Sequence, residues 1–232
     1  MVRKNTIIIT IVLLLYIIFN RNTASEIVRG SNNINLDPKK YSDYYIDRVT
    51  TFKSLQNNKK QIIFLGDSLI DICEWDELFN NPLIKNRGIS GDTTYGVLNR
   101  LDEITEAKPK KVFIMLGIND IGKGRTTEAI IIDYKKILSK IKKDSPDIEI
   151  YVHSVLPINK DIFKTNTKDE EIVNLNSALK SLCEKLQVKY VDLYSLFTVS
   201  GNKLNPKYTT GGIHLNGSGY LVWKEEIKNF CK

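Results

Sequence analysis

Short apolar runs alternate with helix-like segments through most of this chain, and this alternation limits the folds that are open to it. Five runs are short enough to be buried strands: residues 61–66, 83–88, 111–117, 148–155 and 188–193. Segments with helical spacing of apolar residues lie between and after these runs: residues 94–105, 127–143, 168–186 and 216–229. Strands and helices alternating in this way predict βαβ units, and therefore one parallel sheet with helices on both faces.

Two segments of different character precede this pattern. Residues 41–55 are predicted to form a helix, because apolar residues such as Tyr45, Val49 and Phe52 recur near one face. Residues 26–40 are polar and rich in Asn, without a clear period, and are predicted to be a linker or an ordered extension. The sequence therefore predicts an α/β domain over residues 41–232.

Residues 1–25 have the pattern of a secretory signal. An unbroken apolar run, residues 6–19, follows Arg3 and Lys4. At about 14 residues it is shorter than the ~20 that a membrane-spanning helix normally needs. We expect export of the protein, either with cleavage near Ala24 or with the segment kept as an N-terminal anchor that associates with the membrane through residues 6–19. A buried helix is the alternative.

Charge and cysteine content argue against several classes of function. The net charge is +7, but the lysines are scattered over helix-like segments such as 134–143, so a nucleic-acid partner is not expected. The three cysteines, Cys73, Cys183 and Cys231, are too few and too far apart for a disulfide framework or a metal cluster. We expect separate free thiols and no metal.

Polar residues follow three of the predicted strands. Gly-Asp-Ser at 66–68 follows the first, Gly-Ile-Ser-Gly-Asp at 88–92 the second, and Gly-Ile-Asn-Asp at 117–120 the third. Ligand sites in parallel sheets lie beyond the carboxyl ends of the strands, so these loops are expected to meet at one site. His214 stands on a loop just before the last predicted helix and is predicted to join them.

These residue types suit acyl transfer. Ser68 is a candidate nucleophile, and His214 is a better-placed base than His153, which lies inside the fourth apolar run and is predicted to be a core or strand-end residue. The N–H groups of Ser68 and Gly88 and the side-chain amide of Asn119 are candidate donors to an oxyanion. Taken singly, Gly88 also fits a plain turn, and the pair at 119–120 also fits a helix cap.

The segments FLGDSL, NRGISGDTT, GIND and GGIHLN, in this order, resemble the motifs of the SGNH hydrolase superfamily, also called the GDSL esterases and lipases. The resemblance covers most of the chain, and its longer segments are similar to a bacterial branch related to platelet-activating-factor acetylhydrolase subunits and sialic-acid O-acetylesterases. It implies a three-layer α/β/α, flavodoxin-like fold with five parallel strands and no metal or organic cofactor. It also implies a serine esterase with Ser68 as nucleophile, His214 as base and then acid, and an oxyanion hole made by Ser68, Gly88 and Asn119.

One position departs from the family pattern. The family usually has an aspartate three residues before the histidine, and here that residue is Gly211. A backbone carbonyl or a more distant carboxylate could hold the imidazole of an active serine–histidine dyad. Alternatively, the chain is a weakened or inactive relative that keeps its binding cleft, or Gly211 is a single change in an intact enzyme. Three carboxylates lie near other strand ends, and the sequence assigns none of them to His214: Asp92, Asp120 and Asp192.

The sequence thus favours an exported esterase acting on short acyl esters, with acetyl preferred, of a carbohydrate or lipid-derived small molecule. The acetyl preference rests on the branch resemblance alone. The alternative from another class is a non-catalytic acyl- or glycan-binding protein, motivated by Gly211. Loops at 73–79 and 156–166 are expected to supply pocket walls, with Trp75 and Phe79 either lining the pocket or lying in the core. The oligomeric state does not follow from the sequence.

Overall fold

A five-stranded parallel sheet forms the centre of the structure, a computed structural model that describes residues 41–55 and 58–232. The strand order is β2-β1-β3-β4-β5, and every neighbouring pair is parallel. The predicted strands are confirmed, each within a few residues: β1 (Ile62–Gly66), β2 (Ile84–Gly88), β3 (Lys111–Met115), β4 (Glu149–His153) and β5 (Lys189–Val191).

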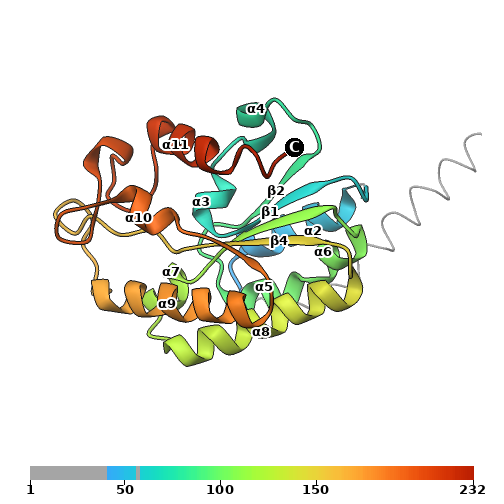
Figure 1. Ribbon diagram of the computed structural model, residues 1–232, viewed down its shortest axis with the longest axis horizontal. Coiled ribbons are helices and arrows are strands. Elements are labelled where there is room, and N and C mark those ends of the chain that lie inside the picture. The colour runs from blue at the N-terminus through green and yellow to red at the C-terminus, as the bar shows by residue number, and fades with distance from the viewer. Residues whose placement is uncertain (1–40, 56–57) are drawn as a thin grey trace, which may run out of the picture. The chain divides into compact units, whose positions relative to one another are not determined.

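Alternate strand residues point to the two faces of the sheet, and both faces are buried. On one face Ile63, Leu65 and Val112 pack in a large aliphatic core with the longer helices. The longer helices that contribute buried residues to this core are α5 (Thr94–Arg100), α6 (Asp102–Ala107), α8 (Thr127–Asp144) and α9 (Asp169–Lys185). Figure 1 shows α8 and α9 running side by side along this face of the sheet.

The opposite face has an aromatic core. Phe113 stacks between Phe64 and Tyr151, with ring centroids 4.8 and 4.5 Å apart. The helices that cover this face are α3 (Ser68–Asp71), α4 (Trp75–Phe79), α10 (Leu193–Phe197) and α11 (Gly217–Ile227). The sheet therefore lies between two helical layers, which is the predicted α/β/α architecture.

Several elements differ from the sequence prediction. The predicted helix at 94–105 is divided at Leu101 into α5 and α6. The one-turn helices and the two-residue strands were not predicted, because they are too short to show a period. They include α3, α4, α10, α7 (Ile118–Gly122), the antiparallel pair β6 (Thr198–Val199) and β7 (Lys203–Leu204), and the 3-10 helix η1 (Pro206–Tyr208).

The chain forms two units, residues 1–56 and 57–232, and the sheet belongs to the second. In the described part of the first, helix α2 (Asp43–Ser54) matches the helix predicted at 41–55. Ser42 caps it, because its Oγ accepts a hydrogen bond from the Tyr45 N–H at 3.2 Å. The predicted signal at 1–25 and linker at 26–40 lie outside the described residues. Within the described ranges, no helix has the length and hydropathy needed to cross a bilayer.

The second histidine and the cysteines belong to the interior. His153 is 0% exposed at the end of β4, where its ring lies 5.6 Å from Phe113 and 5.3 Å from Trp223. Burial lowers the pKa of His153 to about 3, so the ring stays neutral. All three cysteines are buried and free, as expected.

Candidate active site

Ser68 lies where β1 turns sharply into α3. Asp67 stands between them, with φ −98° and ψ −148°, and its Oδ1 accepts a hydrogen bond from the Leu69 N–H at 3.1 Å. This contact caps the short helix and satisfies one of its free N–H groups. The turn leaves Ser68 as the first helical residue, at the carboxyl end of a central strand.

Side chains from three other elements hold the nucleophile loop, which we define as residues 67–73. Tyr220 Oη donates to Leu69 O at 2.9 Å, and Trp75 Nε1 donates to Ile70 O at 2.8 Å. The amide of Asn86 donates to three carbonyl oxygens, at 2.8, 3.0 and 3.0 Å: those of Ile70, Asp71 and Cys73. The fold therefore fixes this loop before any substrate binds.

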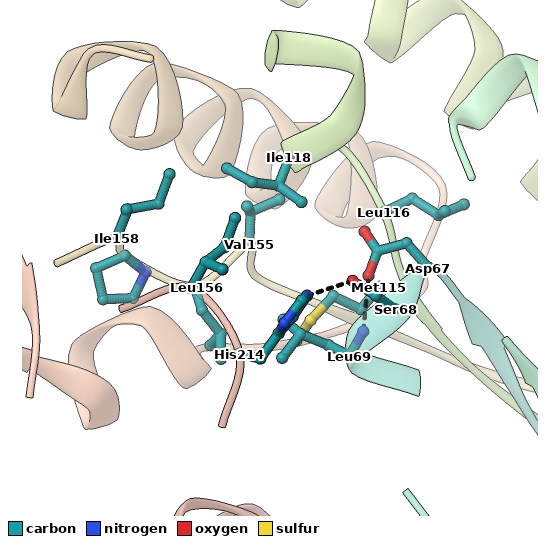
Figure 2. A pocket seen from close by; sticks show the side chains of 12 residues that line it. Asp67, Ser68, Leu69, Met115, Leu116, Ile118, Val155, Leu156, Ile158 and His214 are labelled. Carbon is teal, nitrogen blue, oxygen red and sulfur yellow. Dashed lines mark hydrogen bonds between the residues drawn. The ribbon is translucent and has the colours of Figure 1, made fainter. Parts of the chain in front are cut away.

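The structure brings Ser68 and His214 together. Ser68 Oγ lies 2.9 Å from His214 Nε2, as the dashed line in Figure 2 shows. His214 is exposed at the surface, but partial desolvation still lowers the pKa of its imidazole below the ordinary value. A largely neutral imidazole at this distance can accept the serine proton.

Thr209 closes the histidine loop, which we define as residues 208–216. Its hydroxyl accepts a hydrogen bond from the Gly212 N–H at 2.8 Å and donates to His214 O at 2.6 Å. Gly212 has φ +82°, and a Cβ there would lie 2.8 Å from Asn159 O, so this position requires glycine. The role of Thr209 was not predicted from the sequence. Its signal is a threonine three residues before a glycine, a pattern that side-chain-to-backbone turns use.

Among the residues that the structure describes, no group orients the far side of the imidazole. His214 Nδ1 makes no hydrogen bond with any residue in the ranges 41–55 and 58–232. Gly211 is exposed, and a Cβ added to it meets no atom within 4 Å. An aspartate side chain would therefore fit at this position without displacing a neighbour.

The aspartates near other strand ends have partners elsewhere. Asp92 Oδ2 accepts from Arg100 Nε at 2.9 Å, and burial raises the pKa of that carboxyl. Asp120 pairs with Arg125 at 2.6 Å, and Asp192 caps α10. None of the three hydrogen-bonds the imidazole. Among the described residues there is also no group of three His, Cys, Asp or Glu side chains that could hold a metal ion.

Gly88 does not offer a free donor. Its N–H donates to Asn86 Oδ1 at 2.8 Å. A Cβ at Gly88 would lie 2.2 Å from Asp71 N, so glycine is required here for β2 to approach α3 closely. This geometry does not support the predicted role of Gly88 in the oxyanion hole and gives the residue a packing role instead.

The next glycine along this loop, Gly91, is better suited than Gly88 to donate a hydrogen bond to an oxyanion. Gly91 has φ +80°, and its N–H has no hydrogen-bond partner within the part of the chain that the structure describes. Asp71 Oδ2 holds the preceding Ser90 through its N–H at 2.9 Å and its Oγ at 2.6 Å. On the other side, Asn119 Nδ2 donates to Asp92 O at 3.0 Å. Asn119 thus binds across to this loop with one amide hydrogen and keeps the second hydrogen free.

A narrow apolar cavity opens at Ser68 and His214, with a volume of about 340 Å³ including its open mouth. Figure 2 shows aliphatic side chains on one side of the imidazole and Asp67 on the other. The lining comes from α3, α7, the end of β3, the segments that follow β3 and β4, and the histidine loop: Leu69, Met115, Leu116, Ile118, Val155, Leu156, Pro157, Ile158 and Ile213. The loop expected at 156–166 therefore contributes a wall. Trp75 is instead a core residue, 0% exposed and stacked on Phe64.

Comparisons with known proteins agree with this arrangement. The sequence matches the GDSL-like Lipase/Acylhydrolase family over residues 64–222, a range that contains Ser68, Asn119 and His214. The platelet-activating factor acetylhydrolase IB subunit alpha2 of Rattus norvegicus is 29% identical over 172 residues, which cover 71% of this chain and 73% of that protein.

Solved structures share the fold. A GDSL-like lipase from Bacteroides thetaiotaomicron has a TM-score of 0.71 and 25% identity, with 80% of this chain and 96% of that chain covered. An acetyl xylan esterase has a TM-score of 0.64 and 20% identity, with 74% of this chain and 100% of that chain covered. These similarities agree with the five-stranded parallel sheet and its two helical layers.

Proposed function

The chain belongs to the GDSL-like lipase/acylhydrolase family, and from this premise we propose that it is a serine esterase that removes short acyl groups, acetyl first among them, from carbohydrate or lipid-derived alcohols. The observation that carries the proposal is the 2.9 Å contact between Ser68 Oγ and His214 Nε2. A serine hydroxyl is a weak nucleophile, and a neutral imidazole within hydrogen-bond distance is the base that activates it.

The proposed reaction has two acyl transfers. Ser68 Oγ bonds to the acyl carbon while its proton passes to His214 Nε2. The bond between the acyl carbon and the alcohol oxygen then breaks, and the alcohol leaves with that proton. Water attacks the acyl-enzyme in the same way, gives its proton to Nε2, and releases the acid as Ser68 regains a proton.

We propose that three donors stabilise the oxyanion of each tetrahedral intermediate: the N–H groups of Ser68 and Gly91 and the free amide hydrogen of Asn119. Gly91 takes the place that the sequence had given to Gly88, because its N–H is unpartnered among the described residues and its loop is fixed by Ser90 and Asn119. Such preorganised donors are among the largest contributors to catalysis of acyl transfer.

The cavity beside Ser68 supports the preference for short acyl groups. Ile118, Val155 and Ile158 narrow it with branched side chains whose χ1 angles are restricted. Two of the similar proteins are described as an acetylhydrolase subunit and an acetyl xylan esterase, which supports acetyl in particular.

The open Nδ1 side of His214 supports a second candidate function. Without an orienting carboxylate, turnover in serine proteases falls by roughly 10⁴, or about 5.5 kcal/mol of barrier. A protein with this site could therefore bind acyl esters or glycans and hydrolyse them little.

The turnover of p-nitrophenyl acetate by the purified protein tests the proposed function. We expect hydrolysis well above background, and background rates for Ser68→Ala. Ser195→Ala is a matched control, because this exposed serine bonds Asp192 at the start of α10. Equal rates for the parent and Ser68→Ala would contradict the esterase and favour the binding protein.

We also propose export, which rests on the pattern of basic and apolar residues at 1–25. Immunoblots of culture medium, membrane and cytoplasmic fractions test it. We expect the protein in the medium or the membrane fraction, and an exclusively cytoplasmic protein would contradict export.

A further inference from the structure

We propose that the Nδ1 side of His214, beside Gly211, is a subsite for a carboxylate group that the ligand supplies, carried by the substrate or free in solution. This inference rests on the proposed esterase function and narrows its substrates. An acyl ester that also carries a carboxylate would complete the site with its own acid group.

Among the described residues, the Nδ1 N–H of the neutral imidazole has no hydrogen-bond acceptor. The proposed function requires Nε2, 2.9 Å from Ser68 Oγ, to accept the serine proton, and in that tautomer the ring proton of neutral His214 lies on Nδ1. This N–H has no acceptor among residues 41–55 and 58–232. The ring also becomes positively charged when it takes the serine proton. An anionic acceptor at Nδ1 would hold the required tautomer and stabilise that charge.

The space at Gly211 is open, and the loop that carries it and His214 is fixed. A Cβ at Gly211 meets no atom within 4 Å, and Gly211 is exposed. The loop keeps its shape through Thr209, which bonds Gly212 and His214, so it does not depend on a side chain at position 211. A carboxylate arriving from solvent can therefore reach a preformed position.

The charges around the histidine loop favour an anion. Lys207 is exposed and stands directly before the loop; its Nζ lies 5.8 Å from the centroid of the Tyr208 ring, and it forms no ion pair within the described ranges. The nearby Asp161 is neutralised by Lys203, with Nζ 2.6 Å from Oδ2. An incoming carboxylate would thus meet the positive charge of Lys207, and the negative charge of Asp161 would be offset by Lys203.

Formate dependence of esterase activity is the first test. The full-length protein hydrolyses p-nitrophenyl acetate at constant ionic strength while sodium chloride is replaced by sodium formate. We expect a saturable increase in kcat of at least about tenfold, a small part of the ~10⁴ that an orienting carboxylate contributes in serine proteases. Acetate is unsuitable as the additive because it is a reaction product.

Two glycine variants serve as matched controls. Gly211→Asp places a carboxylate on the chain, so we expect high activity without formate and no further response to it. Gly217→Asp adds the same charge three residues after His214 in the sequence, at another glycine where an added Cβ would meet no atom within 4 Å. Its formate response should equal that of the parent protein.

A pair of esters distinguishes the two sources of the carboxylate. Acetylated galacturonic acid and acetylated galactose differ in one carboxylate. Without formate, we expect the parent protein to prefer the acid by roughly tenfold or more in kcat/KM, within the range that a full orienting carboxylate provides. Gly211→Asp should lose this preference because two carboxylates repel. Formate activation without a preference for the acid would support the subsite and assign it to free carboxylates.

These experiments distinguish failure of the carboxylate subsite from failure of the esterase function. Turnover that depends on Ser68 but shows neither formate activation nor acid preference would overturn the subsite and leave the esterase standing. If only Gly211→Asp is active and formate fails to activate the parent, both the subsite and the esterase function of the parent are overturned, because the parent then has no turnover that depends on Ser68. No turnover dependent on Ser68 in any of these proteins would overturn the proposed function itself.

Discussion

The two loops that meet at the Ser68–His214 contact are held in different ways. The nucleophile loop receives hydrogen bonds from Trp75, Asn86 and Tyr220 and has a buried carboxyl, Asp67, beside the serine. The histidine loop is exposed around its imidazole and has glycine where its family usually has a carboxylate. In the nucleophile loop the carboxyl of Asp67 shapes the backbone. In the histidine loop no carboxyl of the described residues assists His214. The fold therefore fixes the nucleophile, while the strength of the base is left to a ligand.

The largest expected effect is on the histidine side of the contact. We expect His214→Gln to lower kcat for p-nitrophenyl acetate by about 10³, within the range for a general base. The free energy of unfolding should change by less than about 0.5 kcal/mol, because the side chain is at the surface. Steady-state kinetics and urea unfolding of the same preparation measure both quantities. A variant that keeps its turnover would show that another group activates Ser68.

On the nucleophile side we expect loss of stability. Asn86→Ala removes the acceptor of the Gly88 N–H and one donor from each of three carbonyl oxygens, of which those of Ile70 and Cys73 keep a hydrogen bond from Trp75. We expect unfolding to become easier by about 3 kcal/mol, since each buried group left unsatisfied contributes about 1–3 kcal/mol. Urea unfolding measures this, with the exposed Asn174→Ala on α9 as the control. If the free energy of unfolding changes as little in Asn86→Ala as in Asn174→Ala, the Asn86 side chain does not hold the nucleophile loop.

The buried carboxyl predicts a dependence of stability on pH. Burial, more than the nearby Asp92 and Asp120, raises the pKa of Asp67 from 3.8 to about 7. Between these values the folded state keeps a proton that the unfolded state has lost, so this group's contribution to stability falls as pH rises from about 4 to 7. Asp67→Asn keeps an acceptor for Leu69 and does not titrate.

Unfolding of the parent and of Asp67→Asn at pH 5 and pH 8 measures that contribution. Relative to the parent, we expect the variant to gain about 2.5 kcal/mol between the two pH values. Subtracting the two proteins at each pH removes the other titrating groups. A constant difference would show that Asp67 has the same pKa in both states.

The smallest expected effect concerns the closure of the histidine loop. Thr209→Val removes the acceptor for the Gly212 N–H and the donor to His214 O. We expect kcat to fall by about tenfold, and stability to fall by about 1 kcal/mol. Thr209→Ser should restore both, and the exposed neighbour Thr210→Val should change neither. Equal kinetics for the two valine variants would show that the loop needs no such closure.

Much of the fold could be predicted from the sequence because the sheet is buried on both faces. Strands of this kind read as continuous apolar runs, and their ends are followed by the polar residues of the site. The proximity of Ser68 and His214 followed from that placement. The short helices α3 and α7 carry Ser68 and Asn119, yet they were not predicted, because one turn of helix shows no periodicity.

The remaining features of the site depend on contacts across the structure. Gly88 and Gly91 both follow β2, and the sequence could not tell which N–H is free. Asn86 decides this by folding its side chain back onto Gly88, a contact that spacing does not reveal. For the same reason Thr209 looked like one of several small loop residues, although it alone bonds both Gly212 and His214 by its side chain.

Covalent labelling tests the central claim most directly, namely that Ser68 is a nucleophile activated by His214. The purified protein is treated with a fluorophosphonate ester, digested and mapped by mass spectrometry. We predict a label on Ser68, no label on that peptide in Ser68→Ala, and labelling slowed by about 10³ in His214→Gln. A label on another residue, or labelling of Ser68 at the same rate without His214, would contradict the account.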